Sequence, residues 1–158
     1  MKDKFVYRSG TPGKILVARI KSGSDLLFSL KNIVEENGIK AGIILSGVGL
    51  LGKACIRNVK EFPERFPISE EHRAVVSLNG PLEILCLSGN ISMVEGKSSV
   101  HVHAILSYYR GDNINVVGGH VVEGCTVYSF AEVMIMEVES ISMEKKFDEE
   151  TKTFQLFA

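Results

Sequence analysis

The stretch SVHVHAILSYYRGDNINVVGGHVV, residues 99–122, decides the fold that we expect of this chain. Its first half is rich in β-branched and apolar residues, which favour a strand. Its second half has the same character, and the sequence Arg110-Gly111-Asp112-Asn113 between the two halves is a turn signal. We therefore predict a β-hairpin in which a strand over residues 100–108 pairs with a strand over residues 115–122.

Three histidines lie in this hairpin. His101 and His103 are two residues apart, and in a strand such residues point to the same face with their Cα atoms about 6.6 Å apart. His120 follows Gly118 and Gly119, and glycine lets a backbone approach closely and turn the next side chain inward. Three imidazoles that meet in space form a ligand set of the catalytic zinc type, with a fourth position left open.

The sequence therefore predicts a divalent metal bound by His101, His103 and His120. Zinc is the first candidate, although neutral imidazole also suits copper, iron and nickel. The alternative for any single histidine is an ordinary side chain that is half-buried and hydrogen-bonded. Only the three together favour a metal.

Two carboxylates are candidates for the general base of such a site. Glu123 lies near His120 in the chain and could also be a fourth ligand, as could Cys125. Glu132 lies inside an apolar run, where an unpaired carboxylate would be costly to bury. It could pair with a histidine of the metal site or point outward to solvent.

Outside the hairpin the chain is predicted to be mostly strand. The one convincing helix runs from Ser24 to Glu36, where Ser24 or Asp25 can cap the first turn and Gly38 can end the last. A turn at Asn79-Gly80-Pro81 is predicted to join two strands, and residues 58–73 are predicted to form a long loop. The other predicted strands cover residues 14–20, 41–46, 74–78, 82–91, 126–138 and 153–157. The predicted class is α+β, with an antiparallel β-sheet packed on one main α-helix.

Length and composition limit the classes of protein that this chain can belong to. Its 158 residues suit a single domain over residues 1–158, and its formal net charge of −1 gives no basic footprint for nucleic acid. The three cysteines stand singly, which favours reduced thiols and a cytoplasmic location. We expect no signal peptide and no membrane span, because no apolar run reaches about 18 residues.

Three other motifs have a plain structural alternative. Residues 47–52 match the GxGxxG pattern, but a strand-like run follows instead of a helix, which favours a glycine-rich connection between two strands. Lys53, Arg57, His72 and Arg73 could form a small basic patch or a solvated sheet face. The run Tyr108-Tyr109-Arg110 could bind a phosphate or be an aromatic hairpin end.

Several stretches read together resemble the PPC domain, the "plants and prokaryotes conserved" family of predicted DNA-binding proteins. The resemblance covers residues 8 to 141. The matching motifs are Gly23-Ser24-Asp25-Leu26, Ile44-Leu45-Ser46-Gly47-Val48-Gly49, the run from Gly80-Pro81-Leu82-Glu83-Ile84-Leu85 to Cys86-Leu87-Ser88-Gly89, His101-Val102-His103, Val116-Val117-Gly118-Gly119-His120, Gly124-Cys125-Thr126-Val127-Tyr128 and Ala131-Glu132-Val133.

The resemblance implies one main helix against an antiparallel sheet, and a homotrimer. Plant members also carry AT-hooks, short Arg-Gly-Arg-Pro segments that this chain lacks, so DNA binding is expected to be weak or indirect. The first function hypothesis is a trimeric, DNA-associated regulatory or interaction protein. The alternative is a small zinc-dependent hydrolase or lyase that acts on a small molecule.

Overall fold

The computed structural model of the chain describes residues 5–157. These residues form one α-helix, one 3₁₀ turn and eight strands. In chain order the elements are β1 Thr11–Lys21, α1 Leu26–Glu36, β2 Gly42–Val59, η1 Glu70–His72, β3 Arg73–Val94, β4 Lys97–Arg110, β5 Asn113–Val121, β6 Thr126–Glu139, β7 Glu144–Asp148 and β8 Thr153–Leu156.

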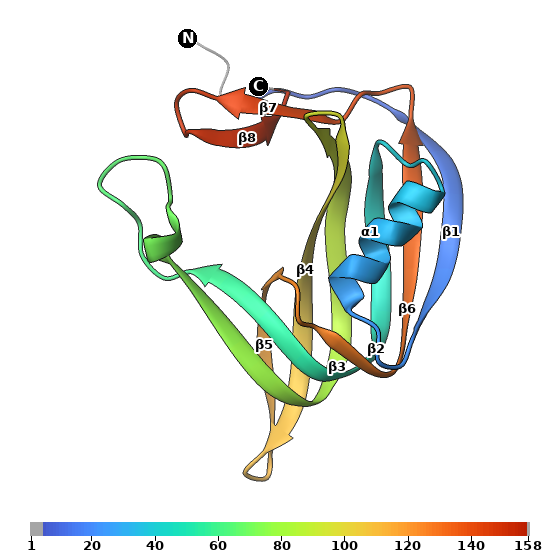
Figure 1. The fold of residues 1–158 in the computed structure, drawn as a ribbon, viewed down its shortest axis with the longest axis vertical. Helices are drawn as coiled ribbons and strands as arrows, with labels where there is room; N and C mark the ends of the chain where they lie inside the picture. Colours follow the sequence, from blue (N-terminus) through green and yellow to red (C-terminus); the bar gives the residue numbers. More distant parts are fainter. Residues whose placement is uncertain (1–4, 158) are drawn as a thin grey trace.

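The strands form one curved sheet in the order β1-β6-β2-β5-β4-β3-β7-β8. An additional pairing of β2 with β3 closes β2, β3, β4 and β5 into a ring. All pairings are antiparallel except that of β3 with β7. Figure 1 shows α1 lying across one face of this sheet. One short helix on eight strands is a mostly β architecture, so the antiparallel sheet and its single helix are confirmed, whereas the α+β class is wrong.

The helix supplies one side of the core. Asp25 caps its first turn, because the Asp25 carboxylate accepts the Phe28 N–H at 2.9 Å. Leu26, Leu30 and Val34 recur at helical spacing and are fully buried against the sheet. The helix ends at Asn37, and Gly38 follows with φ of +64°, which confirms the predicted stop. Neither this helix nor any other in residues 5–157 is long and apolar enough to cross a lipid bilayer.

The predicted hairpin is confirmed. Strand β4 pairs with β5 across a tight turn at Gly111-Asp112, with Arg110 opposite Asn113. From that turn the register runs without a shift to the pair His103 and His120. The turn alone therefore fixes which residues of the two strands face each other.

The predicted turn at Asn79-Gly80-Pro81 is wrong, because β3 continues through it as one strand of 22 residues. Gly80 packs closely on β2, where an added Cβ would meet the carbonyl oxygens of Leu51 and Gly52. The register of β2 against β3 shifts between Leu51 and Lys53, and proline, which cannot donate a backbone hydrogen bond, is tolerated at such a bulge.

Two further expectations change. Residues 47–52 lie inside the single long strand β2, so the glycine-rich run is not a connection between two strands. No helix follows it, in agreement with the rejection of a dinucleotide motif. Strand β7 was not predicted, and its Glu144 and Lys145 pair with Met93 and Val94 of β3.

Candidate metal centre

His101, His103 and His120 converge at one point of the sheet. Their ring centroids lie 4.8 to 5.3 Å apart, and one ligand nitrogen from each ring falls within 4.8 Å of the other two. The Nε2 atoms of His101 and His103 are 3.1 Å apart. Among the described residues these three form the one such group of histidine, cysteine or carboxylate side chains that could hold a metal ion.

The strand register places the three rings together. His103 on β4 lies directly opposite His120 on β5. His101 lies two residues before His103 on β4 and therefore points to the same face. Gly119 allows β5 to approach β2 closely, because an added Cβ would lie 2.5 Å from the Ile56 Cγ2 and 2.6 Å from the Asn58 Oδ1. The Asn58 amide then donates to the Gly118 carbonyl at 2.9 Å, which holds β5 beside β2.

The donor set suits a divalent ion that takes nitrogen ligands. Zinc–nitrogen bonds of about 2.0 to 2.1 Å at a tetrahedral angle place two ligand nitrogens about 3.3 Å apart. The separation of 3.1 Å between the His101 and His103 nitrogens is close to this value. His101 and His120 are half-buried and His103 is exposed, so the cluster is open to solvent on one side.

Two of the imidazoles are held in the neutral form that binds a metal. The pKa of His120 is lowered to about 4, first by burial and then by the nearby His101 and Arg57. The pKa of His101 is also lowered, first by burial and then by the Lys145 ammonium. Both rings therefore carry a free lone pair at neutral pH.

The histidines line a hollow of about 450 Å³. Arg57 of β2 lies directly opposite His120, and Arg73 of β3 lies opposite Val59 on the same face. Figure 1 shows the β7–β8 hairpin and the segment around η1 on the same side of the molecule. The full lining comprises Arg57, Asn58, Val59, Arg73, His101, His103, His120, Lys145 and Phe154.

The two arginines share one carboxylate at the rim. Oε1 of Glu70 accepts from Arg73 at 2.6 Å and lies 3.7 Å from the Arg57 guanidinium. Each arginine side chain is less than one-third exposed, whereas the Glu70 side chain is 74% exposed. Lys145 is half-buried, and burial lowers its pKa.

The structure does not bring Glu123 or Glu132 to the histidines. Glu123 is exposed and forms an ion pair with Lys31 at 3.0 Å. Glu132 is exposed on β6, where it lies opposite Arg19 and Val48. Cys125 is buried and accepts the Cys55 N–H through its sulfur at 3.1 Å. None of the three lines the hollow.

The basic residues of the site were only partly found from the sequence. The sequence predicts Arg57 and Arg73 either in a basic patch or on a solvated sheet face, and the structure places both beside His120. His72 lies apart and bonds Ser69, and Lys53 does not line the hollow. Lys145 comes from the strand that was not predicted, and no sequence signal pointed to it.

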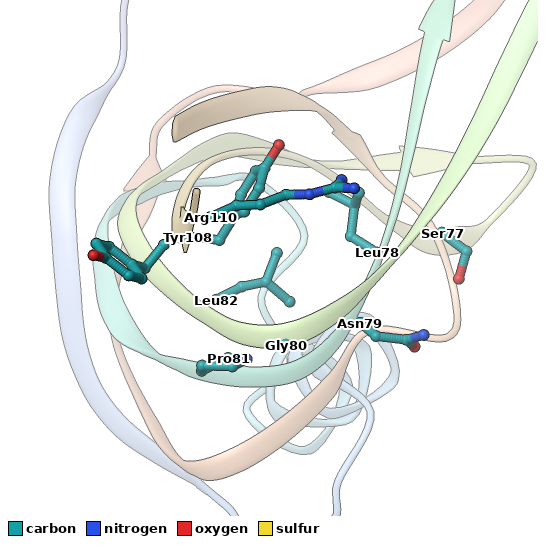
Figure 2. A pocket seen from close by; sticks show the side chains of 9 residues that line it. Ser77, Leu78, Asn79, Gly80, Pro81, Leu82, Tyr108 and Arg110 are labelled. Carbon is teal, nitrogen blue, oxygen red and sulfur yellow. The ribbon is translucent and has the colours of Figure 1, made fainter. Parts of the chain in front are cut away.

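A second hollow of about 330 Å³ lies at the other end of β4. It is lined by residues 77–82 of β3 and 108–110 of β4. Figure 2 shows the Arg110 side chain extending over Leu82 toward Leu78. The Tyr109 hydroxyl donates to Asp112 within the turn at 2.9 Å. These contacts are those of a hairpin end, and Arg110 is the one charged residue among the residues that line this hollow.

Comparison with known proteins gives consistent results for family and fold. The family model described as the Plants and Prokaryotes Conserved (PCC) domain matches residues 7–139. The chain is 28% identical over 143 residues to the bifunctional protein GlmU of a Synechococcus strain, an alignment that covers 90% of this chain and 20% of GlmU. The chain therefore spans about a fifth of the length of the curated relatives that it matches.

Solved structures share the fold over nearly the whole chain. A metal-containing protein of Archaeoglobus fulgidus has a TM-score of 0.78 at 30% identity, with 98% of this chain and 100% of that chain covered. A plant- and prokaryote-conserved protein of Pyrococcus horikoshii has a TM-score of 0.76 at 28% identity, covering 95% and 96%. A candidate DNA-binding protein of Bacteroides thetaiotaomicron, with a TM-score of 0.73 at 19% identity and coverage of 93% and 96%, shows the fold alone.

Proposed function

The chain belongs to the Plants and Prokaryotes Conserved (PCC) domain family, as its motifs predicted, and we propose that it is a metal-dependent member that acts on a small molecule. In this proposal His101, His103 and His120 hold one divalent ion, with zinc as the first candidate. The observation that carries the proposal is the convergence of their ligand nitrogens within 4.8 Å. The description of the Archaeoglobus fulgidus protein as metal-containing supports it.

The residues around the ion suit a small ligand. A divalent ion in such a site acts as a Lewis acid and lowers the pKa of a bound water. The chain's own part is to keep His101 and His120 neutral, to leave one side of the cluster open and to provide a hollow of about 450 Å³. Hydrolase or lyase chemistry fits these features, because neither requires the ion to change its oxidation state.

Metal content tests the proposal directly. We expect the purified protein to carry about one metal ion per chain, measured by elemental analysis, and His103→Ala to lose it because two imidazoles bind an ion far more weakly. His72→Ala is the matched control, since His72 is the remaining histidine of the chain and bonds Ser69 instead. Equal and negligible metal in the wild type and in His103→Ala would contradict the proposal.

We also propose that the chain assembles as a homotrimer. The outer face of β1, β6 and β2 carries several exposed apolar side chains, beside the charged pair Arg19 and Glu132. Val17 lies opposite Met134 on this face, and Ile15 and Val48 extend it. These four side chains are 46% to 73% exposed. Exposed apolar side chains gathered on one face often mark an interface, and a second copy of the same chain is the partner that we propose.

DNA-associated regulation is the first hypothesis from the sequence, and it receives less support than the metal-dependent alternative. The formal net charge of −1 gives little attraction to a phosphate backbone. The cations nearest the histidines line a hollow of a size that suits a small molecule, not a duplex. We retain the prediction that DNA affinity is weak and salt-sensitive, and also the prediction of a cytoplasmic location.

A further inference from the structure

The hollow beside the histidines has an unbalanced charge. Arg57, Arg73 and Lys145 line it, and no carboxylate does so among the residues that the structure describes. Lys145 is half-buried, and within residues 5–157 it forms no ion pair. A half-buried ammonium without an anion is unfavourable, because burial removes water without supplying a partner. The lining is thus complementary to a negative ligand.

The proposed metal strengthens this preference. Three neutral imidazoles leave the charge of a divalent ion uncompensated, so an anionic oxygen is favoured at its open position. Arg57 on β2 lies opposite His120 on β5, and His120 lies opposite His103 on β4. Neighbouring strands lie about 4.8 Å apart, so a ligand of a few heavy atoms can reach from the histidines to the arginines.

Arg57 and Arg73 already bind a carboxylate of the chain itself. Oε1 of Glu70 lies 2.6 Å from Arg73 and 3.7 Å from Arg57, on a side chain that is 74% exposed. Glu70 belongs to the short turn η1, at the end of the connection after β2. An exposed carboxylate can swing away, because its ion pairs are also accessible to water and therefore weak. The same two guanidiniums can then bind a carboxylate of a ligand.

We propose that the hollow binds a small carboxylic acid with a second oxygen donor, such as a 2-hydroxy acid, at two points. The carboxylate replaces Glu70 on Arg57 and Arg73 and is flanked by Lys145, while the second oxygen binds the metal. This inference rests on the proposed metal site. Because arginine and carboxylate form paired, directional hydrogen bonds, the arginines select the carboxylate and fix its orientation.

Calorimetric titration of the zinc-loaded protein with 2-hydroxyisobutyrate tests the inference. We expect binding that is at least about tenfold tighter than that of the uncharged 2-hydroxyisobutyramide, since charge-assisted hydrogen bonds are lost with the amide. Inorganic phosphate serves as a second anion and is expected to bind less tightly. Equal affinity for the acid and the amide, or tighter binding of phosphate, would overturn the choice of a carboxylate.

Paired variants locate the binding groups. Arg73→Gln should weaken binding by about tenfold or more. Lys145→Met should weaken it by about threefold or more, whereas Lys146→Met, on the exposed neighbour, should leave it unchanged. Glu70→Gln should tighten binding several-fold by removing the competing carboxylate, and Glu71→Gln should not. Wild-type affinity in Arg73→Gln, or no gain in Glu70→Gln, would overturn the inference.

Metal content and thermal unfolding of every sample separate the possible failures. If the protein holds no metal ion, the metal proposal fails, and titration of the metal-free protein still tests the arginines, which should bind the acid more weakly and lose it in Arg73→Gln. If the protein holds zinc and the acid does not bind, the carboxylate inference fails while the metal site stands. If Arg73→Gln unfolds at a lower temperature than the wild type, the comparison of Lys145→Met with Lys146→Met decides the inference. Equal affinity for the acid in these two variants would then overturn it.

Discussion

Cys125 is a fully buried thiol that faces the backbone of Cys55. Its sulfur accepts the Cys55 N–H at 3.1 Å, and the thiol donates to the Cys55 carbonyl at 3.4 Å. Burial raises the pKa of Cys125 from 9.0 to about 11. The folded chain therefore retains a proton that the unfolded chain releases, and stability should decrease as the pH rises between these two values.

We expect the free energy of unfolding to fall by about 2 kcal/mol between pH 9 and 11 because of this thiol. Urea unfolding across this range, compared with Cys125→Ala, measures the effect. All other titratable groups are common to the two proteins, so only the difference between the two slopes reports on Cys125. Parallel slopes would contradict the prediction, whatever the offset between the two curves.

The histidines and the arginines of the site differ in how far the sequence predicts them. A two-residue turn at Gly111-Asp112 places His103 opposite His120, so local pattern alone brings these rings together. Arg57 reaches His120 only through the pairing of β2 with β5, which joins residues 63 positions apart. Long-range pairing of this kind depends on the whole sheet, and no local spacing reports it.

At the scale of elements, one carboxylate joins the helix to the loop before β6. The Asp25 Oδ1 atom accepts the Phe28 N–H at 2.9 Å, and its Oδ2 atom accepts the Gly124 N–H at 2.7 Å. Cys125 accepts the Leu26 N–H through its carbonyl oxygen at 2.8 Å. The start of α1 is therefore fixed both by its own cap and by the chain that leads into β6.

Asp25→Ala should lower the free energy of unfolding by about 2 kcal/mol, because it removes the cap and leaves the Gly124 N–H without its partner. Asp25→Asn should lower it by less, since one amide oxygen can still cap the helix. Ser24→Ala is the control and should be nearly neutral. Chemical unfolding measures all three, and a loss in Ser24→Ala equal to that in Asp25→Ala would refute this assignment of the cap.

Most strands were predictable because alternation and β-branched residues mark them locally. The exception inside β3 is instructive, since Asn79-Gly80-Pro81 has the composition of a turn. Gly80 is needed there for contact with the carbonyl oxygens of Leu51 and Gly52 on the next strand, and Pro81 occupies the adjoining bulge. The partner strand β2, which no local pattern reveals, decides whether these residues form a turn or continue the strand.

At the scale of the whole molecule, several apolar side chains on the outer face of β1, β6 and β2 remain exposed in the single chain. Light scattering coupled to size exclusion should give three times the chain mass of 17.4 kDa. Val17→Lys should dissociate the trimer, because three buried ammonium groups would face an apolar interface. Ile114→Lys, on the 76% exposed side chain at the start of β5, should not. A monomeric wild type would contradict the proposal.

The β7–β8 hairpin has a consequence for how such a protein can change over time. The match to the family model ends at residue 139, whereas Lys145 and Phe154 enter the hollow from beyond it. The three histidines therefore lie within the matched residues, whereas one wall of the hollow comes from the β7–β8 hairpin that follows them. Substitutions in this hairpin therefore change the charge and shape of the hollow without altering any of the three histidines.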